Sequence, residues 1–256
     1  MDPDSTDPGS TDPDGYFGAS VAATYDDDIP EGDHGPTGIA RTVDFLAELA
    51  SGRPALEFAI GTGRIALPLA EAGVPVTGIE LSQAMVERLR AKPGGAELPV
   101  TIGDMSTTRV PGSFGLVYLV FNTISNLTSQ DAQVACFGNA AAHLEPGGRF
   151  VVEVGVPDLR RLPPGQTAVP FDLSDDHLGF DTYDTVTQAM TSHHVTIRDG
   201  VAERTSVPFR YAWPAEFDLM ARIAGMRLVE RWDWWDRSPF TAESRRHVSV
   251  WERPAG

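Results

Sequence analysis

The chain has 256 residues and one cysteine, and its 36 Asp and Glu against 20 Lys and Arg give a formal charge of −16. This length suits one large domain or a domain with an insertion, and a single cysteine excludes a disulfide framework. The acidic balance disfavours a nucleic acid as partner, and no basic leader or apolar run of about 18 residues indicates secretion or a membrane, so we expect a cytoplasmic protein.

Residues 1–20 are rich in Asp, Pro, Ser, Thr and Gly, and we expect a disordered tail because this composition offers little apolar surface to bury. Tyr25 follows, ahead of a run of Asp residues, and His34 stands in a predicted turn. An imidazole titrates near neutral pH, so His34 can act as a general base; the alternative is an ordinary histidine in a surface turn. Residues 37–50 carry apolar side chains at helical spacing and predict a core helix.

A short apolar strand that starts at Ala55 runs into the glycine turn Gly61-Thr62-Gly63, and a helix is predicted after Arg64. A strand, a glycine turn and a helix start together present backbone N–H groups and a positive helix end to an anionic or polar ligand. Glycine turns without a ligand also occur in many α/β proteins, so this pattern alone is weak evidence.

Two further strand ends strengthen the prediction of a nucleoside site. Glu80 ends the predicted strand 74–79 and lies 80 − 57 = 23 positions after Glu57, about the spacing at which a carboxylate meets both ribose hydroxyls in a βαβ nucleotide site. Asp104 and Met105 follow the next strand; a carboxylate there can accept from an adenine amine, and a methionine offers a polarisable surface for the base.

These motifs, together with Leu144-Glu-Pro-Gly-Gly-Arg149, resemble those of class I S-adenosylmethionine (SAM)-dependent methyltransferases. The chain is most similar to the branch that methylates small molecules in secondary metabolism, which includes sugar N-methyltransferases. The resemblance covers roughly residues 25–156, with Ala59 where the family's first glycine usually stands. It implies SAM as cofactor and S-adenosylhomocysteine (SAH) as product. The residues implied to bind the cofactor are Tyr25, Glu57, Ala59, Gly61, Thr62, Gly63, Arg64, Glu80, Leu81, Met85, Asp104, Met105, Phe121 and Asn122.

Some of these roles have ordinary alternatives. In the resembled family a tyrosine near the N-terminus folds over the cofactor, and Tyr25 is the candidate; it can equally pack its ring on the first helix. Met85 can be a core residue as well as a ribose or adenine contact. Phe121 and Asn122 end the apolar strand 114–121, at the sheet edge where ligands bind in open α/β sheets. Asn122 resembles a position at which some N-methyltransferases hold an amine.

Residues 157–209 interrupt the βα pattern, and the turn at Asp199-Gly200 predicts a hairpin. We expect an antiparallel insertion that acts as a lid, a substrate platform or a homodimer contact. Its adjacent His193 and His194 point to opposite faces of a strand, and His194 is a candidate general base. No Cys or paired carboxylate stands near them, so no metal is predicted. Near the C-terminus, strand alternation places Trp232 and Trp234 on one face and Trp235 on the other, and these side chains predict either core packing or an aromatic pocket.

The predicted fold is α/β: a doubly wound, Rossmann-like seven-stranded sheet of the methyltransferase type, with an antiparallel β insertion before the last helix. Residues 1–20 form the tail, residues 21–156 and 210–256 the SAM-binding domain, and residues 157–209 the insertion.

The expected reaction is an SN2 transfer of the methyl group of SAM to N or O of a small, natural-product-like acceptor. Such a transfer depends mainly on alignment, so a base need not be obvious; Tyr25, His34 and His194 are the catalytic candidates. The acidic surface mildly favours a neutral or cationic acceptor such as an amino sugar. Two alternatives stay open. One is a SAM-binding protein with a non-methylating activity such as cyclisation, and the other is an NAD-dependent oxidoreductase, which would more often keep a third glycine after Gly63.

Overall fold

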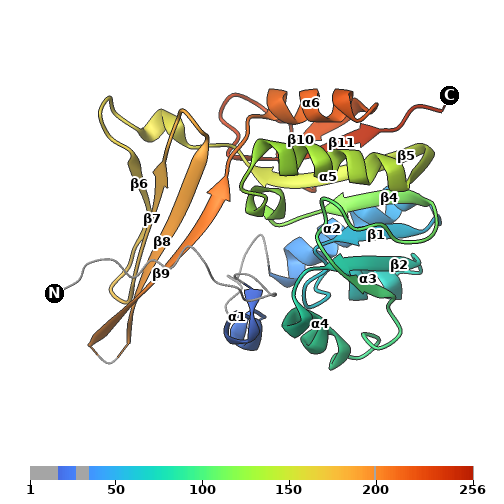
Figure 1. The fold of residues 1–256 in the computed structure, drawn as a ribbon, viewed down its shortest axis with the longest axis horizontal. Coiled ribbons are helices and arrows are strands. Elements are labelled where there is room, and N and C mark those ends of the chain that lie inside the picture. Colours follow the sequence, from blue (N-terminus) through green and yellow to red (C-terminus); the bar gives the residue numbers. More distant parts are fainter. Residues whose placement is uncertain (1–16, 27–34, 199, 256) are drawn as a thin grey trace. The chain divides into compact units, whose positions relative to one another are not determined.

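The structure is a computed structural model that describes residues 17–26, 35–198 and 200–255. Within these residues the strands form a seven-stranded mixed sheet and a separate four-stranded antiparallel sheet (Figure 1). The predicted α/β class with an antiparallel insertion before the last helix is therefore confirmed. Contacts divide the chain into two compact units, Met1–Val110 and Pro111–Gly256. His34 and most of the predicted disordered tail lie outside the described residues.

In the first unit three parallel strands lie side by side in the order β1-β2-β3. Their bounds are Ala55–Phe58, Val76–Glu80 and Val100–Ile102. Ala55 pairs with Val76, and Gly78 pairs with Val100. Because the strands are parallel, their carboxyl ends share one edge, and the residues that follow each strand gather there.

The helices of the first unit are α1 (Ala19–Thr24), α2 (Pro36–Ala50), α3 (Ala66–Glu71) and α4 (Gln83–Arg90). The apolar stripe predicted over residues 37–50 is buried in α2, where Leu46 and Leu49 are almost wholly inaccessible. Helix α4 begins with a side-chain cap, since Ser82 Oγ accepts from the Met85 N–H at 3.1 Å.

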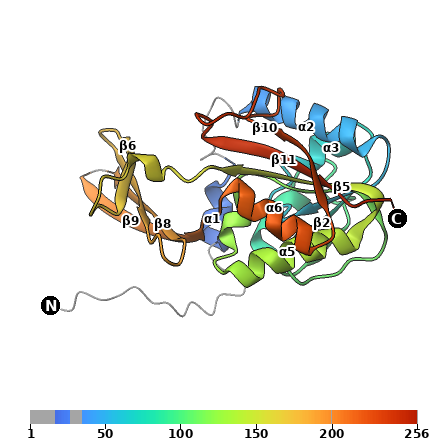
Figure 2. The same ribbon diagram turned by 90° about the horizontal axis from the view of Figure 1, so that it is seen from above.

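In the second unit β4 (Phe114–Leu119) runs parallel to β5 (Leu144–Gly155). Strands β11 (Arg246–Glu252) and β10 (Arg227–Trp232) then continue the sheet antiparallel. All six residues of β4 are buried, as expected of a central strand. Helices α5 (Gln130–His143) and α6 (Pro214–Ile223) lie side by side in Figure 2. The core beneath them is aromatic: the ring of Phe137 lies 5.0, 6.1 and 5.2 Å from those of Phe150, Phe217 and Trp251.

The four-stranded sheet also belongs to the second unit and is an antiparallel meander, β6-β7-β8-β9. The strands are Ala168–Leu173, His177–Tyr183, Ala189–Arg198 and Val201–Arg210. At the end of β9 the buried Arg210 donates to Gln133 Oε1 of α5 at 2.6 Å and to Glu216 Oε1 of α6 at 2.7 Å. These charge-assisted bonds fix the sheet to the helices of its own unit.

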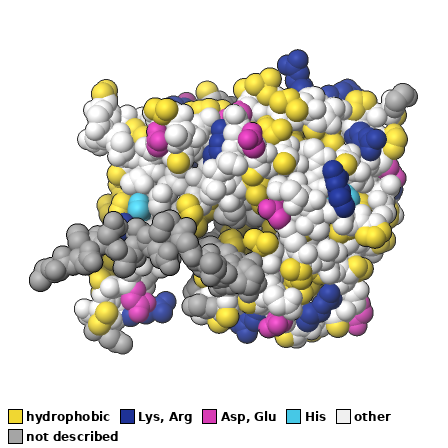
Figure 3. All heavy atoms as spheres, in the orientation of Figure 1, with side chains coloured by type: hydrophobic (Ala, Val, Ile, Leu, Met, Phe, Trp, Pro, Cys, Tyr) yellow, Lys and Arg dark blue, Asp and Glu magenta, His cyan; other side chains and the backbone are white. Residues whose placement is uncertain are grey.

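Two surface properties follow from the described residues. Every helix among them is too short or too polar to cross a membrane. On the face drawn in Figure 3, the Lys and Arg side chains of the described residues are scattered rather than gathered into one patch.

Candidate functional site

Glu80 lies at the carboxyl end of β2 and is only 5% exposed. Its Oε2 accepts from the Gly61 N–H at 2.7 Å, and its Oε1 accepts from the Ser82 N–H at 2.9 Å. The carboxylate therefore joins the glycine turn to the start of α4 and is held in one orientation. A carboxylate has about four acceptor positions, so each oxygen can accept a further hydrogen bond, as a ribose diol requires.

The glycine turn uses left-handed backbone at three positions: Ala59 (φ 53°), Gly61 (φ 56°) and Gly63 (φ 79°). Alanine in this region is strained by roughly 1–2 kcal/mol, which explains why glycine would be preferred at position 59. A Cβ at Gly63 would overlap the side chain of Leu89 in α4 and press on Leu67. Gly63 thus allows the close approach of the turn to α4.

The segment after α1 is anchored on the glycine turn. Thr62 Oγ1 donates to Asp26 Oδ1 at 2.6 Å, and Lys92 Nζ lies 2.8 Å from Asp26 Oδ2. Lys92 Nζ also donates to the Thr62 carbonyl at 2.9 Å. Burial raises the pKa of Asp26, but the hydrogen bonds from Lys92 and Thr62 outweigh it and leave the pKa below its usual value. The sequence did not single out Asp26, because this residue lies in a run of aspartates.

Tyr25 lies next to this anchor and packs edge-on against Phe17, with ring centroids 6.1 Å apart. Burial raises the pKa of its phenol; the charge of Arg64 opposes the shift, and that of Glu80 adds to it. The side chain is therefore close enough to Arg64 and Glu80 to feel both charges. The structure brings Tyr25 to the predicted cofactor residues and also shows the aromatic packing that was its alternative.

The remaining predicted cofactor residues of the first unit differ in exposure. Asp104 is exposed, and its Oδ1 accepts from the Ser106 N–H and hydroxyl at 2.6 and 2.7 Å. Leu81 is 48% exposed, whereas Met85 and Met105 are buried. Glu57 is buried within β1. Leu81, Asp104 and Met105 follow strands and share their carboxyl edge with Glu80, whereas Met85 lies one turn into α4.

Phe121 and Asn122 belong to the second unit and follow β4 closely. Both have left-handed backbone, with φ of 65° and 58°. The Phe121 N–H donates to Glu153 Oε2 at 2.6 Å, and Asn122 Oδ1 accepts from the Gly155 N–H. Two consecutive non-glycine residues in this region are strained, and such strain is common where a structure builds a site.

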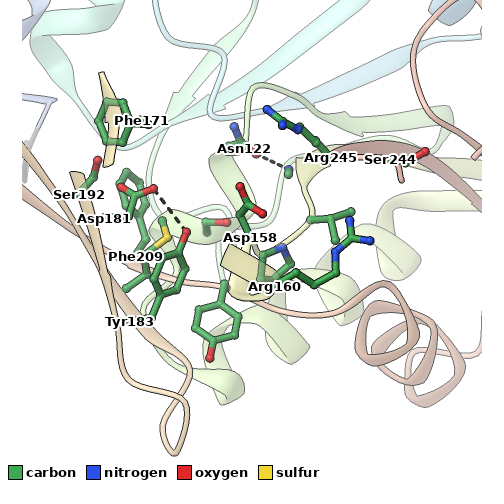
Figure 4. Close-up of a pocket in the computed structure, with 16 residues that line it drawn as sticks. Asn122, Asp158, Arg160, Phe171, Asp181, Tyr183, Ser192, Phe209, Ser244 and Arg245 are labelled. Atoms are coloured by element: carbon green, nitrogen blue, oxygen red, sulfur yellow. Dashed lines mark hydrogen bonds between the residues drawn. The ribbon is translucent and has the colours of Figure 1, made fainter. Parts of the chain in front are cut away.

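Asn122 lines a pocket of about 370 Å³ in the second unit. In Figure 4 two groups of side chains face each other across it. The strands of the smaller sheet supply Phe171, Asp181, Tyr183, Met190, Ser192 and Phe209, and the loops after β4 and β5 and before β11 supply Asn122, Asp158, Arg160, Ser244 and Arg245. The volume and the aromatic side chains in the wall suit a small organic ligand.

The histidines of the smaller sheet lie on both of its faces. His194 Nδ1 is 3.0 Å from His177 Nε2, and His194 Nε2 is 3.2 Å from Ser192 Oγ on the pocket side. His193 instead stacks on Phe180 and contacts Ser206 on the other face. Burial lowers the pKa of His194, as does the nearby His177. His194 thus reaches the pocket through Ser192, not directly.

The tryptophans are packed differently from the predicted alternation. Strand β10 ends at Trp232, and Trp234 and Trp235 follow it as buried side chains, 3% and 4% exposed. Arg246 lies 3.5 Å from the ring centre of Trp234. Core packing, one of the two predicted roles, is what the structure shows for this pair.

The comparisons with known proteins agree with one another. A family model described as a methyltransferase domain matches residues 55–148. The chain is similar to the CcbJ methyltransferase from Streptomyces caelestis, with 38% identity, a TM-score of 0.81, and coverage of 94% of this chain and 98% of that chain.

Two further matches extend this likeness. SAM-bound CalS10, an amino pentose methyltransferase from Micromonospora echinaspora, shares the fold at 21% identity and a TM-score of 0.66, over 93% of this chain and 98% of that chain. The cypemycin N-terminal methyltransferase of a Streptomyces species is 28% identical over 207 residues, which are 79% of this chain and 84% of that protein.

Proposed function

The chain belongs to the SAM-dependent methyltransferases, with SAM as its cofactor, and from this premise we propose that it methylates an amine nitrogen of a small, secondary-metabolite-like acceptor. Family membership removes the NAD-dependent oxidoreductase that the sequence left open. The proposal concerns the methylated atom, a nitrogen, and the chemical class of the acceptor.

Asp181 is the observation that carries the choice of an amine. Its carboxyl group lines the pocket and interacts with Ser192 and Tyr183. Within the part of the chain that the structure describes, no Lys or Arg pairs with it. A partly buried carboxylate without a cationic partner attracts a cation, and an aliphatic amine is an ammonium ion at neutral pH.

Asp158 and Arg160, two of the other charged groups of the pocket, are engaged elsewhere, and Arg245 also lines the pocket. Arg161 Nη1 lies 3.3 Å from Asp158 Oδ2, and Arg160 Nη1 donates to the Ala242 carbonyl at 2.6 Å and faces Glu243 at 3.6 Å. This leaves Asp181 as the carboxylate best placed to receive an acceptor ammonium. The cypemycin relative, which is named for methylation at an N-terminus, supports the same choice.

Asp181 also suits the proton chemistry of an amine acceptor. An ammonium has no lone pair and must lose a proton before it can attack a methyl group. Burial raises the pKa of Asp181 against the opposing hydrogen bonds from Ser192 and Tyr183, which makes it a better base than an exposed aspartate. The aromatic side chains around it hold the apolar part of the acceptor and exclude water.

The first unit fits the cofactor. Glu80 accepts the ribose hydroxyls, the glycine turn admits a close backbone approach, and Asp104 with Met105 holds adenine. Tyr25 and the segment anchored by Asp26 cover the glycine turn. SAM supplies an activated methyl group, and the residues of this chain supply binding and alignment, which are the main requirements of such a transfer.

The experiment is to incubate the protein with SAM and matched acceptors: amino sugars, peptide N-termini and phenols. SAH formation is measured, and mass spectrometry locates the methyl group. Methylated amines support the proposal, and methylation of phenols alone overturns the choice of nitrogen. Binding of SAM without any SAH formed would instead favour the non-methylating alternative. A homodimer through residues 157–209, a cytoplasmic location and the absence of a nucleic-acid partner stay predictions.

A further inference from the structure

A row of hydrogen-bonded side chains runs from the pocket along one face of the smaller sheet. Asp181 and Ser192 are paired across β7 and β8 at the pocket, and the Ser192 side chain lowers the pKa of Asp181. Ser192 Oγ lies 3.2 Å from His194 Nε2, and His194 Nδ1 lies 3.0 Å from His177 Nε2. His177 Nδ1 in turn lies 2.7 Å from Asp172 Oδ2. We call these five residues the histidine row.

Strand register explains why the row is continuous. Asp181 pairs with Ser192, and Gly179 pairs with His194, so alternate residues of β7 and β8 share the pocket face. Gly179 leaves room above the strand for the ring of Phe171, since a Cβ there would overlap that ring. The Phe171 ring lies 5.4 Å from His194 and 6.4 Å from His177, against both imidazoles.

The hydrogen-bond directions are consistent along the row. An ionised Asp172 only accepts, so His177 carries its proton on Nδ1 and, when neutral, accepts at Nε2. His194 then donates from Nδ1 to His177, and its Nε2 accepts from the Ser192 hydroxyl once Asp181 is protonated and no longer takes that one hydroxyl proton. Each imidazole uses one tautomer, and each donor has an acceptor. Such an arrangement can pass a proton by successive short transfers.

From Ser192 outward, exposure rises along the row. Ser192 is 8% exposed, the His177 side chain 25%, and the Asp172 side chain 41%. The row therefore links the interior of the pocket with solvent at β6.

We propose that the histidine row is the proton exit of the methyl-transfer reaction, a role that rests on the proposed function of the pocket. Methylation of an ammonium acceptor, R–NH3⁺ + SAM⁺ → R–NH2⁺–CH3 + SAH + H⁺, releases one proton per turnover, and methylation of a hydroxyl also releases one. A bound acceptor closes the opening of the pocket, so the proton cannot leave through that opening. It needs a second path.

The transfers balance as follows. Asp181 takes the proton from the acceptor nitrogen and gives it to Ser192 Oγ, while the Ser192 hydroxyl proton moves to His194 Nε2. The Nδ1 proton of His194 moves to His177 Nε2, and the Nδ1 proton of His177 moves to Asp172, which releases it to water. One proton enters and one leaves. Both imidazoles then hold their proton on Nε2 and regain the starting tautomer by exchange with water.

The charges around His194 agree with this role. His177, Asp181 and His193 act on its pKa, which burial and the two histidines lower while Asp181 raises it. The lowered pKa favours the neutral form of His194, which can accept at Nε2. Arg204 lies against His193 on the opposite face, and Asp172 holds the far end of the row.

The test compares His194→Ala and His194→Gln with His193→Ala, the matched control on the other face of the same strand. Steady-state methylation of an accepted amine is measured from pH 6 to 9, with and without added imidazole. We expect kcat of both His194 variants to fall about tenfold or more at neutral pH, with KM for the acceptor nearly unchanged and the loss smaller at high pH. Added imidazole restores part of the rate of His194→Ala, and His193→Ala behaves like the wild type.

Two results overturn the proton exit: His194 variants that keep the wild-type kcat and pH profile, or a loss that neither imidazole nor high pH relieves. The second result would mark a structural role, which circular dichroism and the melting temperature would reveal independently. Failure of the proposed function looks different, because the wild-type protein itself would then methylate no amine.

Discussion

Asp26 accepts a 2.6 Å hydrogen bond from the Thr62 hydroxyl and thereby connects the segment after α1 with the glycine turn, 36 positions further along the chain. Lys92 pairs with the same carboxylate and with the Thr62 carbonyl. Arg88 adds contacts to the carbonyl groups of Ala22 and Ala23 at the end of α1. Polar contacts therefore hold the short helix α1 at its C-terminal end.

Removal of the Asp26 carboxylate should loosen the segment after α1 from the glycine turn. For Asp26→Ala we expect SAM binding to weaken by about 0.5–1 kcal/mol, since the bonds are partly exposed and screened by solvent. Calorimetry measures the affinity, and hydrogen exchange of residues 19–25 should become faster. Asp44→Ala, on α2, is the control. Equal exchange in Asp26→Ala and the wild type would contradict the anchor.

Glu80→Ala should weaken SAM binding by roughly 1–3 kcal/mol through the loss of charge-assisted hydrogen bonds to the ribose. Because Glu80 also binds the Gly61 and Ser82 N–H groups, the melting temperature of the ligand-free variant is needed as well. Glu87→Ala, on the exposed face of α4, is the matched control. Unchanged affinity for SAM in a folded Glu80→Ala would mean that the ribose lies elsewhere.

Asp181→Asn keeps the shape of the pocket but removes the negative charge that we assign to the acceptor. We expect kcat/KM for an amine to fall about 10²-fold or more, while SAM affinity stays the same. Asp184→Asn, in the exposed turn after β7, is the control. Equal losses of kcat/KM in Asp181→Asn and Asp184→Asn would show that binding and reaction of the acceptor do not depend specifically on Asp181.

The pH dependence of the wild-type methylation rate is a second test of the role of Asp181. Burial raises its pKa, and only the ionised form takes a proton. The rate should therefore fall as the pH drops through this raised pKa, at a higher pH than the value of about 3.9 for an ordinary aspartate. The profile of kcat/KM against pH measures it, and an acid limb with the pKa of an exposed aspartate would count against the assignment.

Gly63→Ala should destabilise the protein through both backbone strain and overlap with Leu89, by about 1–3 kcal/mol for the overlap alone. Gly73→Ala separates the two effects, because Gly73 has φ of 90° but nothing within 4 Å of an added Cβ. It should cost about 1–2 kcal/mol from strain. Chemical denaturation of both variants tests this, and equal losses would contradict the close packing of turn and helix.

The buried His247 should make the stability of the fold sensitive to acid. The side chain is fully buried between Phe217 and Phe240, and burial lowers its pKa to about 3. The unfolded chain, with a pKa near 6.5, binds more protons below that pH, so stability falls as the pH drops from about 6.5 towards 3. The contribution of this group reaches about 1.4 kcal/mol per pH unit. In His247→Gln the free energy of unfolding, measured relative to its value at pH 7, should no longer fall with this slope as the pH drops. An unchanged slope would show that other groups cause the acid sensitivity.

Much of the fold was accessible from local patterns. Alternation of apolar strands with helices predicted the α/β class, and the turn at Asp199-Gly200 predicted the hairpin that became β8 and β9. The order of short motifs predicted the methyltransferase family. These features depend on side chains close together in the chain, whose spacing and propensity act before any tertiary contact forms.

The tryptophans show where local reasoning ends. Alternation predicts that Trp232 and Trp234 share a strand face, but β10 ends at Trp232, and Trp234 packs under Arg246. The end of a strand depends on its neighbours, which the local pattern does not contain.

By itself the sequence determined the class of fold, the family and the strand ends that gather around Glu80, because each of these is written in residues a few positions apart. Only the tertiary structure decided that Asp181 faces the pocket and that Asp172, His177, His194 and Ser192 meet in one row. Strand register makes that choice, since a shift of one residue would turn every one of these side chains to the other face. Register is set by pairing along whole strands, and no short motif records it.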